Sequence, residues 1–280
     1  MPEELQINVD QVLNYLSNRM RSYVLDYASL ESAIIGLSGG VDSAVIAYLT
    51  ARALGIKRTC LCLLPSKTTP KKDMDDAYAI VDSIKIPHAN VKTIPIDEYV
   101  EKIAEATNTS SQDKLGIGNI KARIRMILLH SLAHLHNGLV IGTGDKSEIS
   151  IGYFTKFGDG GVDILPIGDL YKSQVRQVAS NVNLPKNVYE KPPSPGLWKG
   201  QSAENELGID YFLLDRILFR RFDLWLDEKT IAEELSIPLS CVRKVIGRVK
   251  LTQHKRLPTE IFKVSSRAYG SDLRYPRQWS

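Results

Sequence analysis

A glycine-rich loop at residues 36–43 (Gly-Leu-Ser-Gly-Gly-Val-Asp-Ser) constrains the fold of this chain more than any other feature. The apolar run at residues 33–37 predicts a buried strand before the loop, and the apolar pattern at residues 44–49 predicts a helix after it. Loop glycines let backbone N–H groups approach an anion, and a helix N-terminus favours negative charge. Asp42 would repel a phosphate unless a cation lay between them, so the loop predicts a magnesium–nucleotide complex.

Strands and helices alternate along the first two thirds of the chain. This order predicts an α/β fold with a doubly wound, mostly parallel, Rossmann-like sheet and helical N- and C-terminal extensions. Ligands bind such sheets at the carboxyl ends of the strands, so the loops after strands 33–37, 59–64 and 139–142 should converge on one site. We expect one domain, with a core at about 30–185 and a C-terminal helical portion at about 205–265, because no clean linker interrupts the sequence. The predicted strands are 33–37, 59–64, 91–96 and 139–142, and the predicted helices are 8–29, 43–54, 72–85, 118–136 and most of 207–250.

Composition narrows the class of protein. The 280 residues are 43% hydrophobic, which is enough for a substantial core, and the formal net charge of +4 suits small anionic substrates without requiring nucleic acid. Three cysteines form neither a disulfide framework nor a zinc-binding spacing, which favours a reduced, cytoplasmic setting. No signal-peptide pattern and no apolar stretch long enough to span a membrane are present.

Two further segments carry side chains suited to binding a nucleotide. The segment 142–148 follows a predicted strand and offers the hydroxyl of Thr143 and the carboxylate of Glu148. Glu148 and Asp42 could therefore supply two carboxylates to Mg²⁺ from separate loops, which suffices because Mg²⁺ keeps waters and takes its other oxygens from phosphates. Lys172 and Arg176 lie four residues apart on a predicted helix, where a cation could neutralise phosphates, although a solvated helix face explains such a pair equally well.

Other patterns permit different functions. Residues 228–249 resemble a helix-turn-helix with a basic second helix, so a nucleic-acid-binding protein remains an alternative. His130 and His134 are spaced as metal ligands, but no glutamate occupies the position that a metalloprotease requires. Cys60 and Cys62 share one face of a predicted strand and are interpreted as small buried groups.

The glycine-rich loop is not a Walker A motif, because no lysine follows Gly40. It resembles the SGGxDS loop of the ATP pyrophosphatases, which cleave ATP between the α- and β-phosphates. Over nearly its whole length the chain is similar to the ammonia-dependent NAD synthetase family, whose fold is of the adenine nucleotide alpha-hydrolase type. The Phe-Thr-Lys-Phe-Gly-Asp-Gly-Gly string separates this family from other SGGxDS proteins, such as amidotransferases and tRNA thiolases, which remain an alternative. The resemblance rests on residues 38–43, 121–126, 142–148, 153–161, 193–194, 201–208 and 254–256.

The resemblance implies an activity, namely the ATP-dependent amidation of deamido-NAD to NAD in the last step of NAD biosynthesis. The nicotinate carboxylate attacks the α-phosphorus of ATP to give an NAD-adenylate and pyrophosphate, and ammonia then displaces AMP. The nucleophile belongs to the substrate, so the enzyme contributes positioning and charge stabilisation. ATP is thus a co-substrate and Mg²⁺ the cofactor.

The resemblance also implies roles for individual residues. The loop 65–70, with Ser66 and Lys67, matches a mobile loop over the nucleotide, and the proline- and glycine-rich segment 191–200 has the composition of a flap. Ser194 stands where many relatives carry Thr, and the hydroxyl is kept. The implied ATP-binding residues are Gly36, Leu37, Ser38, Gly39, Gly40, Val41, Asp42, Ser43, Thr143, Lys172 and Ser194. The implied deamido-NAD-binding residues are Arg123, Lys156, Asp163, His254 and Lys255, and the implied metal ligands are Asp42 and Glu148. The implied catalytic residues are Asp42, Lys172 and Asp159, of which Asp159 would orient or deprotonate ammonium.

Family members are homodimers with the deamido-NAD site at the subunit interface, so a homodimer is expected here. The synthetase motifs begin within the first 40 residues, which leaves no room for the N-terminal glutaminase domain of glutamine-using relatives. Free ammonia, or ammonia from a separate protein, is therefore expected as the nitrogen source, with no nucleic-acid or membrane partner.

Overall fold

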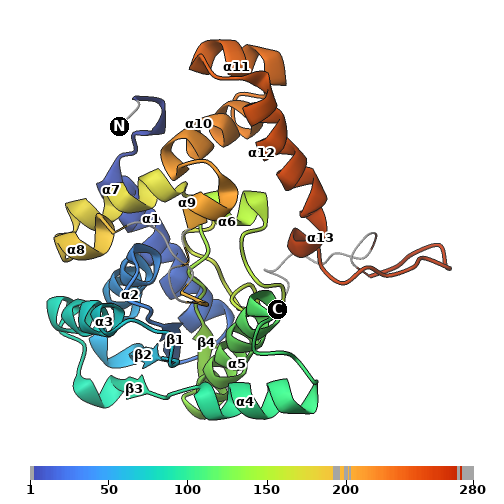
Figure 1. Cartoon of the computed structure of the whole chain (residues 1–280). Coiled ribbons are helices and arrows are strands. Elements are labelled where there is room, and N and C mark those ends of the chain that lie inside the picture. The colour runs from blue at the N-terminus through green and yellow to red at the C-terminus, as the bar shows by residue number, and fades with distance from the viewer. Residues whose placement is uncertain (1–2, 192–195, 199–200, 202, 270–271, 273–280) are drawn as a thin grey trace.

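A four-stranded parallel sheet forms the centre of the protein in a computed structural model, which describes residues 3–191, 196–198, 201, 203–269 and 272 (Figure 1). The strand order is β3-β2-β1-β4, and all three pairings are parallel. The sequence predicted this mostly parallel sheet correctly. The strands are β1 (Ser32–Gly36), β2 (Thr59–Leu63), β3 (Val91–Thr93) and β4 (Gly138–Val140).

Helices cover both faces of the sheet because the strands are apolar on both faces. Along β1, Ala33 and Ile35 pack into a cluster with the helices α1, α2 and α7, while Ile34 packs into a second cluster with α4 and α5. This alternation is the period of two that a strand imposes on its side chains. The fold is therefore doubly wound, as predicted. The helices before the C-terminal portion are α1 (Val9–Arg21), α2 (Val41–Leu54), α3 (Lys71–Ile84), α4 (Asp97–Ala106), α5 (Lys114–Leu135), α6 (Lys146–Ile151), α7 (Lys172–Asn181) and α8 (Lys186–Tyr189).

Among the elements that differ from the prediction, α5, β3 and α4 differ most clearly, and the predicted helix 8–29 ends as α1 at Arg21 and continues as a π-helical turn at Ser22–Tyr27. Helix α5 begins four residues earlier than expected, because the Asp113 side chain accepts a hydrogen bond from Gly116 N at 2.8 Å and caps the helix. Strand β3 ends at Thr93, two residues before Pro95, which has no N–H for a ladder. Helix α4 has no counterpart in the predicted elements; Val100 packs on the sheet while most of the helix is exposed.

A third apolar cluster lies beyond the sheet, in the C-terminal helical portion. Helices α11 and α12 form the helix pair that the sequence predicted over 228–249, and Val242, Val245 and Ile246 of α12 are buried in the cluster. Figure 1 shows these helices stacked beyond α6 and α7, on the side of the molecule away from α4. The helices here are α9 (Ala203–Leu207), α10 (Tyr211–Phe222), α11 (Glu228–Leu235), α12 (Leu239–Leu251) and α13 (Gln253–Arg256).

No helix among the described residues is both long enough and apolar enough to cross a bilayer.

Candidate active site

The glycine-rich loop connects β1 to α2 in a conformation that requires glycine. Gly39 has a φ of +79°, and a Cβ there would overlap the carbonyl oxygen of Asp73. The Ser43 hydroxyl donates to Gly40 O at 3.0 Å and accepts from Ser38 N at 3.3 Å. Ser43 therefore holds the loop together from inside, while the Ser38 side chain is exposed.

The loops after β1, β2 and β4 converge on one cavity. This was predicted, because ligands bind parallel sheets at the carboxyl ends of the strands. Its volume is about 460 Å³. The glycine-rich loop forms one wall, and the segments that follow Val140 and Thr155 form another. Among the predicted residues, those lining the cavity are Gly36, Leu37, Ser38, Gly40, Val41, Asp42, Thr143, Glu148, Asp159 and Lys255.

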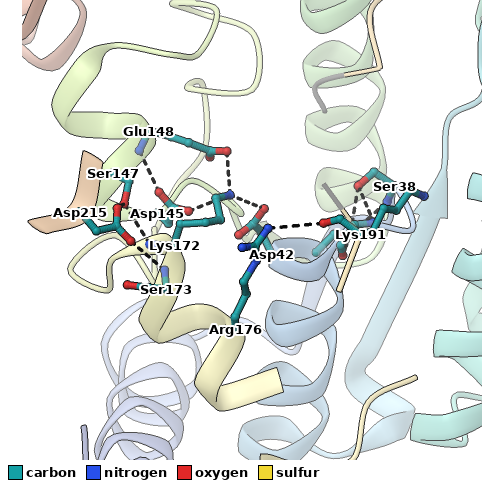
Figure 2. Close-up of polar contacts among 12 residues, drawn as sticks. Ser38, Asp42, Asp145, Ser147, Glu148, Lys172, Ser173, Arg176, Lys191 and Asp215 are labelled. Atoms are coloured by element: carbon teal, nitrogen blue, oxygen red, sulfur yellow. Dashed lines mark hydrogen bonds and ion pairs between the residues drawn. The ribbon is translucent and has the colours of Figure 1, made fainter. Parts of the chain in front are cut away.

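Three carboxylates surround the ammonium group of Lys172 beside this cavity (Figure 2). The Lys172 Nζ atom lies 2.7 Å from Asp42 Oδ2, 2.8 Å from Asp145 Oδ2 and 2.8 Å from Glu148 Oε1. Carboxylate oxygens of the three acids all lie within 4.8 Å of one another. The structure thus joins Asp42, Glu148 and Lys172, which the sequence placed on three separate segments, and Lys172 lies behind the cavity surface.

Burial and charge act in opposite directions in this cluster. Burial disfavours the ammonium form of Lys172, but the carboxylates of Asp145, Asp42 and Glu148 outweigh it and hold the pKa of Lys172 well above its usual value. Burial raises the pKa of Glu148 well above its usual value, and Lys172 opposes that shift. Lys172 offers one positive charge to three acidic side chains, so a further cation would favour the ionised forms of these acids.

Asp145 is a member of this cluster that the sequence reasoning missed. It is fully buried, and its Oδ1 accepts a hydrogen bond from Glu148 N at 2.8 Å, so it caps α6. Burial raises the pKa of Asp145 to about 7. An available signal was the spacing Asp145-x-x-Glu148 after a strand, which is typical of a helix N-terminus and would have placed both acids at the same end of the sheet.

Three cationic residues that the sequence reasoning did not assign, Arg125, Lys191 and Arg248, also line the cavity. Arg125 donates from Nε to Leu64 O at 3.1 Å. Lys191 reaches across to α3, where its Nζ lies 2.5 Å from Asp73 Oδ1 and 2.9 Å from Asp76 Oδ2. Arg125 lies in the string at 121–126 that marked the family resemblance, so its position in the sequence was a usable signal.

Asp159 and Lys255 face the cavity from the segment after Thr155 and from α13. The Asp159 Oδ1 atom accepts a hydrogen bond from Thr155 N at 2.8 Å. Desolvation by the surrounding protein raises the pKa of the Asp159 carboxyl, although its side chain is open to the cavity, and the hydrogen bond from Thr155 opposes that shift. Lys255 Nζ donates to Phe154 O at 2.6 Å and to Gly152 O at 2.8 Å. These bonds tie α13 to residues 152–154, just before the glycine-rich segment at 155–163.

The other residues predicted for deamido-NAD lie outside the cavity. Lys156 Nζ donates to His254 O at 2.7 Å, and Arg123 Nη2 donates to Lys156 O at 3.5 Å, so these three form a group at the surface. Asp163 Oδ2 accepts from Val140 N at 2.8 Å, which holds the segment at 163 against β4. Ser194 and most of the predicted flap lie outside the described residues.

The predicted loop at 65–70 is held by contacts within the loop and with α4. The Ser66 side chain is buried, and Lys67 Nζ lies 2.6 Å from Glu101 Oε1 of α4. Within this loop, Pro65 and Thr69 line the cavity.

Comparison with known proteins agrees with this arrangement. The profile of the NAD synthase family matches residues 12–259. The NH(3)-dependent NAD(+) synthetase of Saccharolobus solfataricus is 49% identical over 278 residues, which are 99% of this chain and 98% of the relative. The protein of that name from Sulfolobus acidocaldarius is 47% identical over the same shares of the two chains.

Solved structures show the same relationship in three dimensions. An NMN synthetase from Francisella tularensis superposes with a TM-score of 0.79 at 32% identity, covering 91% of this chain and 99% of the other. An NH3-dependent NAD synthetase from Campylobacter jejuni, in complex with nitrate ion, gives 0.76 at 27% identity, covering 92% of this chain and 100% of the other. The glycine-rich loop, the acidic cluster at the ends of β1 and β4, and these matches over most of the chain together show that the protein belongs to the NAD synthase family.

Proposed function

We propose that this protein is a ligase that amidates deamido-NAD to NAD with ammonia, consuming ATP and releasing AMP and pyrophosphate. Its relatives at 47–49% identity carry the name NH(3)-dependent NAD(+) synthetase over nearly their full length. The family match runs through residues 228–249, which favours this function over nucleic-acid binding by that helix pair. The observation that carries the proposal is the acidic cluster of Asp42, Asp145 and Glu148 beside the glycine-rich loop.

The acidic cluster fits a magnesium ion. Its oxygens are close together, and the buried Oδ1 of Asp42 has no hydrogen-bond partner among the described residues. Hard carboxylate oxygens are the ligands that Mg²⁺ takes from proteins. We assign Asp42 and Glu148 as ligands, with Asp145 behind them; a bound Mg²⁺ would supply positive charge to the phosphates of ATP.

The rest of the chemistry follows from positioning. The backbone of residues 36–43 would bind the departing pyrophosphate at the N-terminus of α2, together with Thr143, Lys172 and Ser194. The carboxylate of deamido-NAD would attack the α-phosphorus and break its bond to the bridging oxygen. Ammonia would then add to the acyl carbon and AMP would leave, with Asp159 placed in the cavity to take a proton from ammonium.

We assign deamido-NAD to the group formed by Arg123, Lys156, His254 and Lys255 together with Asp163. Arg123 and His254 are exposed beside the cavity, which suits a substrate held between this chain and a second copy. The assembly we propose is a homodimer of single-domain chains, each with a core at about 30–185 and a C-terminal helical portion at about 205–265. We further propose a cytoplasmic location, with ammonia taken up free or from a separate protein.

A product assay tests this function. Purified protein with deamido-NAD, MgATP and ammonium should form NAD, AMP and pyrophosphate in equal amounts, measured by chromatography. The variant Asp42→Asn should lower turnover by at least about 100-fold, because the charge that stabilises the transferring phosphates is lost. Release of ADP and orthophosphate instead would contradict the proposal.

A second acceptor deserves a parallel assay, since one structural neighbour at 32% identity is named NMN synthetase. Amidation of nicotinate mononucleotide would give NMN by the same chemistry. We expect deamido-NAD to show the higher kcat/KM, and the reverse order would assign the protein to NMN formation.

A further inference from the structure

Helix α10 reaches the acidic cluster from the C-terminal portion, and two of its residues one turn apart face the cluster. The Tyr211 ring centroid lies 5.2 Å from Lys172 Nζ. Asp215 is fully buried, in a helix whose other buried positions include Leu214, Ile217 and Leu218. A buried carboxylate among apolar residues is costly unless its oxygens are hydrogen-bonded, so its contacts indicate its role.

Asp215 contacts the starts of α6 and α7, two of the three helices that carry the cluster (Figure 2). Its Oδ1 accepts from the Ser147 hydroxyl at 2.5 Å, and its Oδ2 accepts from Ser173 N at 2.8 Å. The Ser147 oxygen in turn accepts from Lys172 N at 2.9 Å. A hydroxyl has one proton, so by donating it to Asp215, Ser147 leaves its lone pairs for the Lys172 amide.

These bonds fix the backbone on either side of the cluster. Ser147 immediately precedes Glu148 in α6, and Lys172 and Ser173 open α7. The first N–H groups of a helix have no partner within the helix. Here the amides of Lys172 and Ser173 are satisfied by Ser147 and Asp215, so the start of α7 is tied to the start of α6 through one carboxylate.

Hydrogen-bond acceptors, rather than an ion pair, explain why a carboxylate suits this position. No ion pair to Asp215 occurs in the part of the chain that the structure describes. Burial raises the pKa of Asp215, and hydrogen bonds from Ser147 and Ser173 oppose that shift. A carboxylate offers two acceptor oxygens, whereas an amide would present an NH₂ group to one of the two donors.

We propose that Asp215 is a positioning residue of the active site, which sets the spacing of α6 and α7 so that Glu148 and Lys172 meet Asp42. The expected effect on kcat rests on the proposed function. The expected effect on the backbone at the start of α7 rests on the hydrogen-bond geometry alone. Groups that orient the residues of a metal-binding site change activity by about 10- to 100-fold when mutated.

The test compares Asp215→Asn with Asp210→Ala on the same helix. Asp210 is exposed and caps α10 by accepting from Leu213 N at 2.8 Å, so its loss weakens the helix without touching the cluster. We expect Asp215→Asn to lower kcat for NAD formation about 10- to 100-fold with KM for deamido-NAD changed less than about twofold. Asp210→Ala should lower the thermal midpoint by about as much as Asp215→Asn does, but keep kcat within about twofold of the wild type.

Amide hydrogen exchange at residues 172 and 173 gives a readout that needs no substrate. Exchange there should accelerate in Asp215→Asn and stay as in the wild type in Asp210→Ala. Ser147→Ala supplies a second, milder variant: it should also accelerate exchange at 172, and in the double variant kcat should fall no further than in the worse single variant.

The outcomes separate the two proposals. If the wild type forms no NAD but exchange at 172 and 173 depends on Asp215, the proposed function fails and the structural part of the inference stands. If the wild type forms NAD but Asp215→Asn loses no more kcat than Asp210→Ala, the positioning role is overturned. Additive losses in the Ser147 and Asp215 double variant would overturn it equally, because they would show that the two residues act separately.

Discussion

The side-chain nitrogen of Lys172 lies 2.7 Å from Oδ2 of Asp42, and this contact joins the start of α7 to the start of α2 across 130 residues of sequence. Lys172 is completely buried, and Asp145 and Glu148 complete the group around its ammonium. The stability of the fold and the charge of the site therefore depend on the same four side chains.

Replacing Lys172 by methionine should leave Asp42, Glu148 and the fully buried Asp145 without their shared ammonium partner. Removing one partner of a buried ion pair typically costs about 3–5 kcal/mol of unfolding free energy. Lys146→Met is the matched control, because Lys146 pairs with Asp169 and Asp223 nearer the surface, where a pair contributes about 1 kcal/mol or less. Urea denaturation measures both variants; equal losses would show that the cluster does not depend on Lys172.

Asp145 should make stability depend on pH. Its pKa is raised from 3.8 to about 7 in the folded state, so the folded state binds the proton more tightly than the unfolded state. The resulting stabilisation is fully present below about pH 4 and is lost as pH rises through 7. The unfolding free energy of the wild type minus that of Asp145→Asn should fall across this range, measured by denaturation in metal-free buffer at several pH values. A flat difference would contradict the raised pKa.

Two adjacent glycines should respond differently to alanine. Gly39→Ala places a methyl group against the Asp73 carbonyl at a positive φ, and such strain costs about 1–3 kcal/mol or more. At Gly40 the φ is −93° and the nearest atom to a new Cβ is Ser38 Oγ at 3.4 Å, so Gly40→Ala should cost less than about 1 kcal/mol. Thermal denaturation of the pair tests the loop conformation, and equal effects would refute it.

The proposed dimer predicts complementation between inactive variants. Asp42 lies in the cavity and Arg123 is exposed outside it, so the two would serve one substrate from different subunits. Mixing Asp42→Asn with Arg123→Ala under subunit exchange should restore about a quarter of wild-type activity, because half the dimers are mixed and each holds one intact site. If activity does not return although sedimentation shows mixed dimers, both residues serve the same subunit's site.

Much of the fold could be predicted because its signals are local. The alternation of apolar strands with helical patterns predicted the parallel sheet, and the loop at 36–43 predicted its own strand–turn–helix context. Helix α4 is amphipathic but short, and Val100 is the one of its ten residues that is buried, so it contributes a single core position to the pattern. The early start of α5 depends on one side-chain cap at Asp113, which periodicity does not register.

By itself, the sequence determined that the β1–α2 loop is built around glycines, that Asp42, Thr143 and Glu148 follow strand ends, and that these ends meet at one edge of a parallel sheet. The tertiary structure decided that Lys172 lies among the carboxylates, that Asp145 belongs with them, and that Asp215 of α10 ties α6 to α7. The first set follows from residue types and spacings within short segments. The second depends on which side chains from distant segments are buried together, and that is fixed only when the helices pack.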